Sequence, residues 1–291
     1  MNPNRCGLEE RRHVQEAAPL TGHYPAYTVC PLVLDQPRSQ FLDTWKFYGI
    51  THSEHVVCNP TSEQKLGQLV DLMQLPTDAH VVDIASGKGE FLICLAEAYG
   101  VRGVGIDLSP FFVAEADRRL GERLPEAGIS FAQMDGAEFE PDNQHSFTVA
   151  SCLGASWIFG GHEGTLDALV NMVAPGGWVI AGEPYWLREP PEEYLLATGL
   201  TSDAFGRHIE NVEAGERRGL DLVHTLVSNK DDWDRYEGLQ WYASSQYARA
   251  HRDDPDLPEL LELVAKDKSA YLRWGRETVG WAIYVFRYGS A

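Results

Sequence analysis

The sequence predicts an α/β fold in which a doubly wound, mainly parallel sheet is covered by helices on both faces. Two observations lead to this prediction. Between residues 80 and 183, short apolar strands alternate with helical segments, which is the pattern of βαβ units. A glycine-rich turn also follows the first of these strands and opens a helix, as ligand-binding loops do at the carboxyl edge of such sheets.

Each element is expected from its hydrophobic period and its boundary residues. The strands of the alternating region are expected at 80–85, 101–107, 129–135, 147–152 and 178–183. Its helices are expected at 90–99, 110–120 and 163–173. Two further strands are expected at 220–228 and 281–288, and the remaining helices at 39–48, 61–75, 233–249 and 257–273.

These elements divide the chain into three parts. Residues 1–38 contain four spaced prolines, which rule out a long helix and predict an irregular arm. Residues 39–75 are expected to form a helical lid in which His52, His55 and Asn59 fold over the open edge of the sheet. Residues 76–291 form the predicted core, with helical additions at 187–215 and 231–275.

Composition limits the partners and the compartment. The net charge of −19 over 291 residues argues against nucleic acid, which is bound largely through Lys and Arg. No apolar run approaches the roughly 18 residues of a membrane span, so no membrane partner is expected. The five cysteines include no CxxC pair, which favours reduced thiols in a cytoplasmic protein. The oligomeric state is left open.

The turn itself narrows the choice of ligand. In VVDIASGKGEFL (residues 81–92), Gly87 and Gly89 let a ligand lie against bare backbone at a helix start. A dinucleotide loop would place a third glycine where Leu92 stands. Asp83 would repel a pyrophosphate but could face a cation. The turn therefore indicates a nucleoside-like, positively charged ligand, and S-adenosylmethionine fits that description.

Two more acids follow strands and strengthen this interpretation. Asp107 ends the second strand, where a carboxylate can accept both ribose hydroxyls, and Ser109-Pro110 caps the next helix. Asp135 ends the third strand, where it can accept the adenine amine. Acids at three successive strand ends share the edge at which doubly wound sheets bind ligands.

At these residues the chain resembles the class I S-adenosylmethionine-dependent methyltransferases. The resemblance implies a Rossmann-like, seven-stranded sheet in the class I methyltransferase order, with S-adenosylmethionine as cofactor. It departs from the family at Ala85, where glycine is usual, and the methyl group is tolerable there if the backbone stays at negative φ. The implied cofactor-binding residues are Asp83, Ala85, Ser86, Gly87, Gly89, Asp107, Leu108, Asp135, Gly136, Ala137 and Cys152.

More narrowly, the chain resembles an uncharacterised bacterial subgroup of small-molecule methyltransferases. Four sequence motifs carry this likeness, namely His52-Ser-Glu-His55 with Asn59-Pro60, the loop 154–161, Gly182 to Trp186, and Trp233 to Glu237. The resemblance implies the chemistry and leaves the acceptor open.

The acceptor is expected beyond the fourth and fifth strands. Glu183, His162 and Tyr185 are the candidate catalytic residues, and Trp157 and Trp186 are the candidate substrate-binding residues, together forming an aromatic box with an acid beneath it. His162 could equally be a solvated residue at a helix start. The acidic charge favours a neutral or cationic acceptor, namely a nitrogen-containing ring or an amine.

The predicted reaction is in-line transfer of the methyl group to a small molecule. No cluster with metal-ligand spacing is apparent in these loops, so no metal is expected. Two alternatives stay open at this stage. One is a nicotinamide-dependent oxidoreductase, which Leu92 and Asp83 disfavour, and the other is a non-catalytic S-adenosylmethionine-binding module.

Overall fold

The structure is a computed structural model and describes residues 42–289. The arm expected over 1–38 lies outside the described residues, as does the start of the helix expected at 39–48. That helix, α1 (Thr44–Thr51), begins where the Asp43 side chain accepts a hydrogen bond from the Lys46 backbone N–H, which is an N-cap arrangement.

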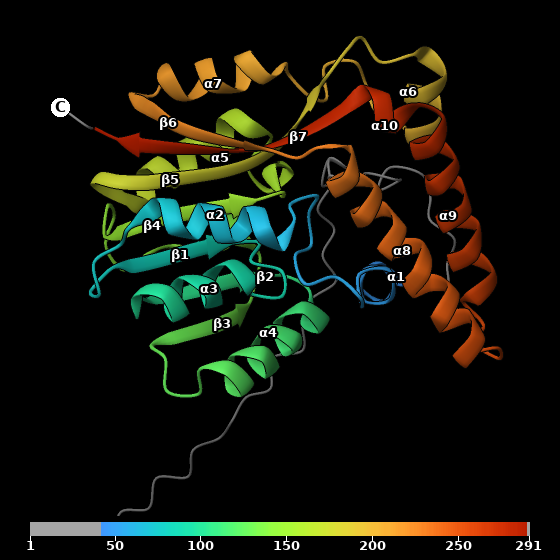
Figure 1. Ribbon diagram of the computed structural model, residues 1–291, viewed down its shortest axis with the longest axis horizontal. Helices are drawn as coiled ribbons and strands as arrows, with labels where there is room; N and C mark the ends of the chain where they lie inside the picture. Colours follow the sequence, from blue (N-terminus) through green and yellow to red (C-terminus); the bar gives the residue numbers. More distant parts are fainter. Residues whose placement is uncertain (1–41, 290–291) are drawn as a thin grey trace, which may run out of the picture.

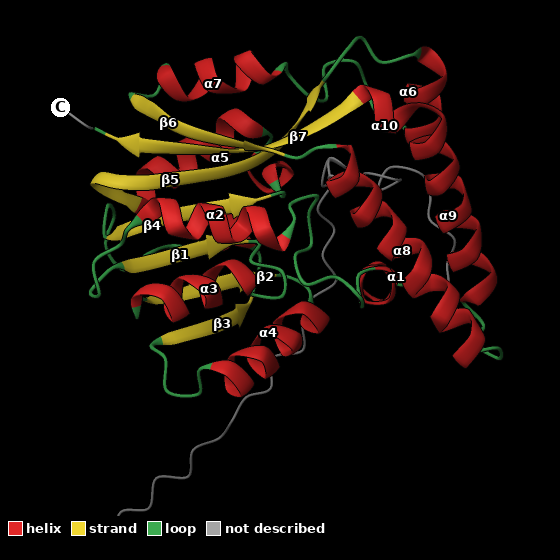
Figure 2. Ribbon diagram, viewed as in Figure 1, coloured by secondary structure: helices red, strands yellow, loops and turns green. Residues whose placement is uncertain are grey.

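Seven strands form one sheet, as predicted (Figure 2). Their order is β3-β2-β1-β4-β5-β7-β6, and β7 runs antiparallel to both of its neighbours. The sequence order reverses between β1 and β4, so the carboxyl ends of the parallel strands meet a crevice there. The strands are β1 (His80–Ile84), β2 (Arg102–Asp107), β3 (Ile129–Gln133), β4 (Phe147–Leu153), β5 (Val173–Trp186), β6 (Leu220–Val227) and β7 (Val279–Tyr288).

Each face of the sheet has its own apolar core, because successive residues of a strand point to opposite sides. On one face Val81 packs with residues of α2 (Glu63–Met73) and α3 (Glu90–Tyr99), and Leu120 of α4 (Pro110–Arg123) adjoins them. On the other face Val82 packs with α5 (His162–Met172) and α7 (His208–Glu216). The two cores are the hydrophobic basis of the doubly wound fold.

A third apolar cluster lies beyond the carboxyl ends of the parallel strands, among the helices that Figure 1 shows at that edge. It joins Trp186 and Trp281, at the ends of β5 and β7, to the helices at that edge. These helices include α6 (Glu192–Thr198), α8 (Lys230–Ala250) and α9 (Leu257–Ala270), followed by a π turn (Tyr271–Gly275) and α10 (Arg276–Thr278). Helix α8 begins before the expected residue 233 because Asn229 and Asp232 form a capping box.

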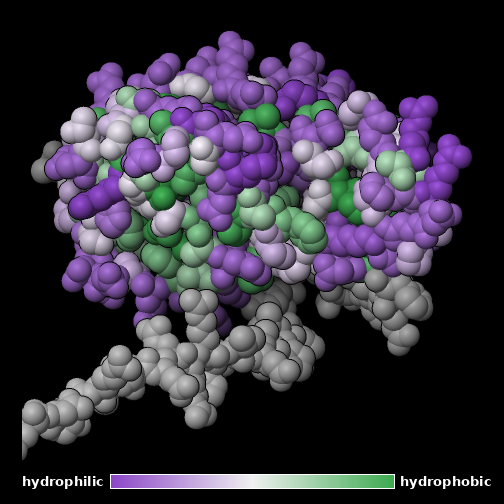
Figure 3. Space-filling view, turned by 90° about the horizontal axis from the view of Figure 1, so that it is seen from below, coloured by the Kyte–Doolittle hydropathy of each residue, from purple (hydrophilic) through white to green (hydrophobic). Residues whose placement is uncertain are grey.

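The segment expected to act as a lid divides in two. Helix α2 buries Leu66, Leu69 and Met73 in the core of the sheet, so it is a permanent layer of the fold. Helix α1 instead packs on α8 at the carboxyl edge. None of the helices within residues 42–289 is long and apolar enough to cross a membrane. The face seen from below is mainly hydrophilic, with small groups of apolar residues between (Figure 3).

Candidate functional site

The turn between β1 and α3 is held in a left-handed backbone conformation. Ala85, Gly87 and Gly89 have φ values of 55°, 56° and 74°. The condition of a negative φ at Ala85 is therefore not met, and an L-residue occupies a conformation that costs about 1–2 kcal/mol. At Gly89 a Cβ would lie 2.3 Å from the Phe131 ring, so only glycine fits that position.

Leu92 explains how the turn works without a third glycine. Its side chain is fully buried, and a Cβ on Gly103 of β2 would lie 3.1 Å from Leu92 Cδ1 and 2.5 Å from the Val81 carbonyl oxygen. The close packing of helix on strand is therefore made possible by a glycine of the strand. A dinucleotide motif uses a glycine of the helix for the same purpose.

Asp107 connects the turn to the end of β2. Its Oδ2 accepts a hydrogen bond of 2.8 Å from the Gly87 N–H, and its Oδ1 accepts one of 2.8 Å from the Ser109 N–H. Burial raises the pKa of this carboxyl to about 6, while these two N–H donors lower it. Each oxygen has a second lone-pair direction, so the carboxylate can still accept hydroxyl groups of a ligand.

Asp83 is a buried acid at the end of β1. Its Oδ1 accepts a hydrogen bond of 2.6 Å from Ser151 Oγ of β4. Burial, with a contribution from the charge of Asp107, raises the pKa of Asp83 to about 7, against the Ser151 hydrogen bond. Ser86 Oγ is also buried and has no hydrogen-bond partner in the described part of the chain. An acid of this kind favours a cationic ligand, and an unpartnered hydroxyl favours a polar one.

The third strand end carries Asp135, Gly136 and Ala137. Asp135 caps a short 3₁₀ turn (Gly136–Glu138), with Oδ1 accepting a hydrogen bond of 2.9 Å from the Ala137 N–H. A Cβ on Gly136 would lie 2.6 Å from Ile84 Cγ2, so this turn packs directly on β1. Leu108 is half-buried beside Asp107.

Cys152 does not present its thiol to this edge. Its side chain is buried with Ile84 and Ala181 in the core below the sheet, and burial raises the pKa of the thiol. Only the backbone of Cys152 is therefore available to a ligand at the strand end.

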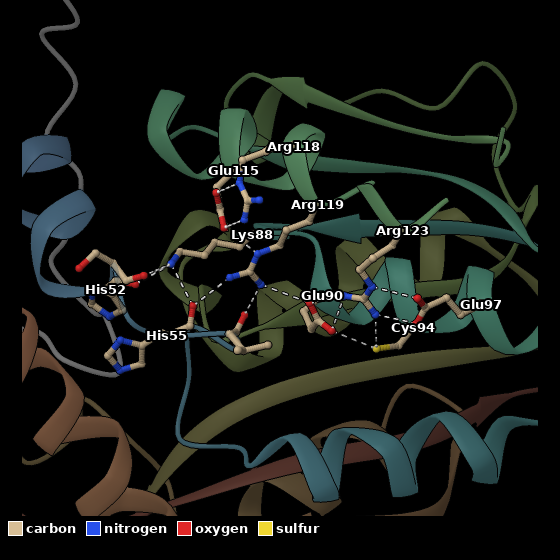
Figure 4. A network of polar contacts seen from close by, with 12 residues as sticks. His52, His55, Lys88, Glu90, Cys94, Glu97, Glu115, Arg118, Arg119 and Arg123 are labelled. Atoms are coloured by element: carbon tan, nitrogen blue, oxygen red, sulfur yellow. Dashed lines mark hydrogen bonds and ion pairs between the residues drawn. The ribbon is translucent and has the colours of Figure 1, made fainter. Parts of the chain in front are cut away.

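A lysine that the sequence analysis did not single out holds a roof over the turn (Figure 4). Lys88 Nζ donates to the backbone carbonyls of His52, Ser53 and His55 at 2.7, 3.0 and 2.9 Å. The Lys88 side chain is buried, so its charge is compensated by these carbonyl dipoles. The sequence feature that could have identified Lys88 is its position as the only cation within the glycine-rich turn. We call residues 52–59 the roof segment.

Two further contacts fix the roof segment in place. Arg119 of α4 donates to the Val56 and His55 carbonyls at 3.0 and 3.2 Å. Asn59 Nδ2 donates to the Leu153 carbonyl at 3.1 Å, at the carboxyl end of β4. A Cβ on Gly87 would lie 3.6 Å from the Cβ of Cys58, so the roof segment passes directly beside the turn.

Glu183 of β5 lies beneath the loop that follows β4. Its Oε1 accepts a hydrogen bond of 3.1 Å from Ser156 Oγ, and its Oε2 lies 3.9 Å from His162 Nδ1. Neither Oε2 nor Nδ1 has another partner among the described residues. Burial raises the pKa of Glu183 to about 8 and lowers that of His162 to about 4. At neutral pH both groups are therefore uncharged, and one carboxyl proton can lie between them.

The position of His162 excludes one of its two sequence-based interpretations. It is buried at the first position of α5, and its Nε2 donates to the Asn211 carbonyl oxygen at 3.1 Å. The solvated helix-start interpretation is therefore wrong. Because Nε2 carries the hydrogen, Nδ1 faces Glu183 as a free acceptor.

The residues expected to form one aromatic box lie on both sides of the sheet. Tyr185 lies on the α7 side, with its ring centroid 4.9 Å from that of His208. Trp186 points to the opposite face, packs on Phe205 and donates from Nε1 to the Ser202 carbonyl at 2.9 Å. Trp157 is half-buried in a 3₁₀ turn (Ser156–Phe159) on the side of Tyr185. Trp186 therefore belongs to the cluster beneath α8.

Within residues 42–289, no three His, Cys, Asp or Glu side chains are grouped so that they could hold a metal ion. The acids of the site are instead distributed singly over β1, β2 and β5, where each accepts at least one hydrogen bond from a hydroxyl or N–H donor.

Comparisons with known proteins agree with this arrangement. Residues 81–177 match a family model described as a methyltransferase domain. The chain is 31% identical to the uncharacterized protein YjhP of Escherichia coli over 246 residues, covering 84% of this chain and 98% of YjhP. It is also similar to an S-adenosylmethionine-dependent methyltransferase from Geobacter sulfurreducens, solved with S-adenosyl-L-homocysteine. The TM-score is 0.78 at 31% identity, over 85% of this chain and 99% of that one.

A third relative has a named substrate. The chain is 32% identical to trans-aconitate 2-methyltransferase of Paracidovorax citrulli over 173 residues, which covers 57% of this chain and 64% of that protein.

Proposed function

The chain belongs to the class I S-adenosylmethionine-dependent methyltransferases, and we propose that it methylates a small molecule bound at the carboxyl edge of the sheet, beside Glu183. When bound, S-adenosylmethionine supplies an electrophilic methyl group on a sulfonium. This membership sets aside both the oxidoreductase and the non-catalytic binding module.

The residues around the turn fit this cofactor. We assign the ribose hydroxyls to Asp107, with Leu108 beside it. We assign the adenine amine to Asp135, with Gly136 and Ala137 in contact with the adenine ring. Asp83 and the unpartnered Ser86 hydroxyl would hold the amino acid group of the cofactor. The positive charge of its amino group offsets the negative charge of an ionised Asp83. Gly87, Gly89 and Ala85 provide the backbone against which it lies.

Three lines of support favour a small acceptor over a polymer. The net charge of −19 repels polyanions. The roof segment is fixed on the turn by Lys88 and Arg119, which leaves the edge covered rather than open. The relative from Paracidovorax citrulli carries a small molecule in its name.

The Glu183–His162 pair carries the mechanistic proposal. Oε2 and Nδ1 face one another without other partners, so Glu183 can take a proton at Oε2 and share it with His162 Nδ1. An acceptor that loses a proton on methylation, such as an amine or a hydroxyl, needs such a site. Because burial raises the pKa of Glu183 to about 8, turnover is expected to increase as the pH rises through that value.

The acceptor can be found by incubating the protein with labelled S-adenosylmethionine and a fractionated bacterial extract. Mass spectrometry then identifies the methylated product. A small metabolite is expected, whereas label found only in protein or nucleic acid would contradict the proposal. The predicted metal-free transfer is tested in the same assay, because chelation with EDTA should leave the turnover unchanged.

With the acceptor in hand, Glu183→Gln should retain S-adenosylhomocysteine affinity and lower turnover by about 10² or more. The amide keeps the hydrogen bond from Ser156 but cannot take up a proton. Glu163→Gln is the matched control, because Glu163 lies at the exposed start of the same helix as His162 and pairs with Arg217. Equal turnover in Glu183→Gln and the control would rule out the proton-accepting role.

A further inference from the structure

The inner face of α8 buries polar side chains where a helix of a bundle normally buries apolar ones. Trp233, Glu237 and Gln240 are only 7%, 4% and 6% exposed. Residues at spacings of three and four lie on one face of a helix, so these three side chains share the face that meets α9 and the π turn. Such a face needs polar partners.

Two hydrogen-bond donors on this face of α8 have no hydrogen-bond partner among the described residues. Trp233 Nε1 and Gln240 Nε2 are both buried without a hydrogen-bond partner among the described residues. An unmade buried hydrogen bond costs about 1–3 kcal/mol. Two such donors, one turn on either side of Glu237, indicate that an oxygen-bearing ligand completes this face.

Aromatic rings and acids surround the same place. The Trp233 and Tyr271 rings stack at 6.3 Å with an interplanar angle of 25°, and the Trp241 and Tyr271 centroids are 6.1 Å apart. Asp267 of α9 is buried near Glu237, and burial together with the charge of Asp267 raises the pKa of Glu237 to about 8. At the rim, Lys268 Nζ already lies 4.7 Å above the Trp241 ring.

This cluster is connected to the roof segment and to the end of β5. Tyr236, the neighbour of Glu237, is hydrogen-bonded through its hydroxyl to His52 Nε2 at 3.0 Å and accepts from His55 Nε2 at its carbonyl at 2.9 Å. Both histidines belong to the roof segment beside the cofactor turn. Trp186, at the end of β5, lies in the same apolar cluster as Trp233. A molecule on α8 would therefore reach toward the carboxyl edge of the sheet.

We infer that the inner face of α8, with Tyr271 and Asp267, binds an alkylammonium group of the acceptor, at a point remote from the atom that is methylated. The inference rests on the proposed function. Aromatic faces and buried carboxylates together stabilise a cation that has left water. The bound cation would displace the proton that Glu237 holds at neutral pH. The free donors of Trp233 and Gln240 would hold a hydroxyl or carbonyl oxygen of the same molecule. The substrate class is then a small ammonium compound that carries such an oxygen.

Choline and its neutral isostere 3,3-dimethylbutan-1-ol test this assignment, because they differ only in charge. Binding is followed by tryptophan fluorescence in protein saturated with S-adenosylhomocysteine. Choline should bind at least about tenfold more tightly than the isostere. Equal binding of the two, or no choline binding, would overturn the inference.

Two variants assign the binding to this face. Glu237→Gln should weaken choline about tenfold or more and leave the isostere unchanged, and Gln240→Leu should weaken both because each has a hydroxyl. Glu262→Gln, at an exposed position of α9, is the control. If Glu237→Gln does not fold, Gln240→Leu decides, and unchanged choline affinity there overturns the site. Failure of the wild-type protein to bind S-adenosylhomocysteine would instead contradict the proposed function.

Discussion

Asp107 holds the cofactor turn in place through the Gly87 and Ser109 N–H groups. Its substitution is therefore expected to lower the stability of the fold as well as the ligand affinity. Asp107→Asn keeps one acceptor oxygen but turns an amide donor toward a backbone N–H. We expect S-adenosylhomocysteine affinity to fall by about 1.5 to 3 kcal/mol, measured by calorimetry. The free energy of unfolding should also fall, by about 1 to 2 kcal/mol.

Ser109→Ala separates the two effects of Asp107. It removes the N-cap hydrogen bond from the Phe112 N–H, which costs about 1 kcal/mol of stability. It removes no hydrogen bond to the ligand. If Asp107→Asn bound the ligand as tightly as this control, Asp107 would have no role in ribose binding.

Ala85 is the second residue at which the structure makes a specific demand. Its φ of 55° is strained by about 1–2 kcal/mol for an L-residue. Ala85→Gly removes this strain, but it gives back about 0.5–1 kcal/mol through the greater freedom of the unfolded chain. We therefore expect a net gain of about 0.5 kcal/mol in denaturant unfolding. A loss of stability greater than 1 kcal/mol, on the order of a glycine in an ordinary helix, would contradict the left-handed conformation.

At the scale of elements, Lys88 connects the roof segment to the core. Lys88→Met keeps the apolar stem but leaves the His52, Ser53 and His55 carbonyls without their donor. Unsatisfied buried groups cost about 1–3 kcal/mol each, offset where water enters. We expect faster amide hydrogen exchange over residues 52–59 and weaker S-adenosylhomocysteine binding. Arg118→Ala is the control, because its exposed ion pairs on α4 contribute little to stability. Equal hydrogen exchange in both variants would contradict the role of Lys88 in holding the roof segment.

The elements differ in how far the sequence predicts them. All seven strands were expected from apolar runs bounded by turn residues, because burial on both faces makes such runs conspicuous. The boundaries were less accurate. Strand β5 begins at Val173 rather than Trp178, and its pairing with β4 shifts register between Phe147 and Val149 of β4. Pairing partners set where a strand begins, and local sequence does not contain them.

The two sides of the site were also predicted unequally. The acids at the ends of β1, β2 and β3 were found because each lies at, or within two residues of, the end of its strand. The aromatic box was predicted as one group, although Tyr185 and Trp186 are adjacent in one strand and must therefore face opposite ways. The Lys88 clamp and the polar face of α8 depend on contacts between distant segments, which no local pattern contains.

At the scale of the whole molecule, buried titratable groups make stability depend on pH in both directions. Burial lowers the pKa of His52, His55 and His162 from 6.5. These residues are neutral when folded and take up protons when unfolded, so below about pH 6.5 stability rises with pH. Burial raises the pKa of Glu183 and Glu237 from 4.5 to about 8, and it raises the pKa of Asp83 and Asp107 from 3.8 to about 7 and about 6. The folded state binds these protons more tightly, so stability is lost as the pH rises toward 8.

The two effects oppose each other below about pH 6.5, and only the acids act above it. We therefore expect stability to fall between pH 6.5 and 8, with a slope of up to about 1.4 kcal/mol per pH unit for each acid that is still protonated in the folded state. Denaturant unfolding measured across this range checks the prediction. Glu183→Gln and Glu237→Gln should each remove one acid's share of the slope, because an amide stays neutral at every pH. Exposed Glu262→Gln should leave the slope unchanged, and a wild-type stability that is flat from pH 6.5 to 8 would mean that both carboxyls are ionised in the folded protein.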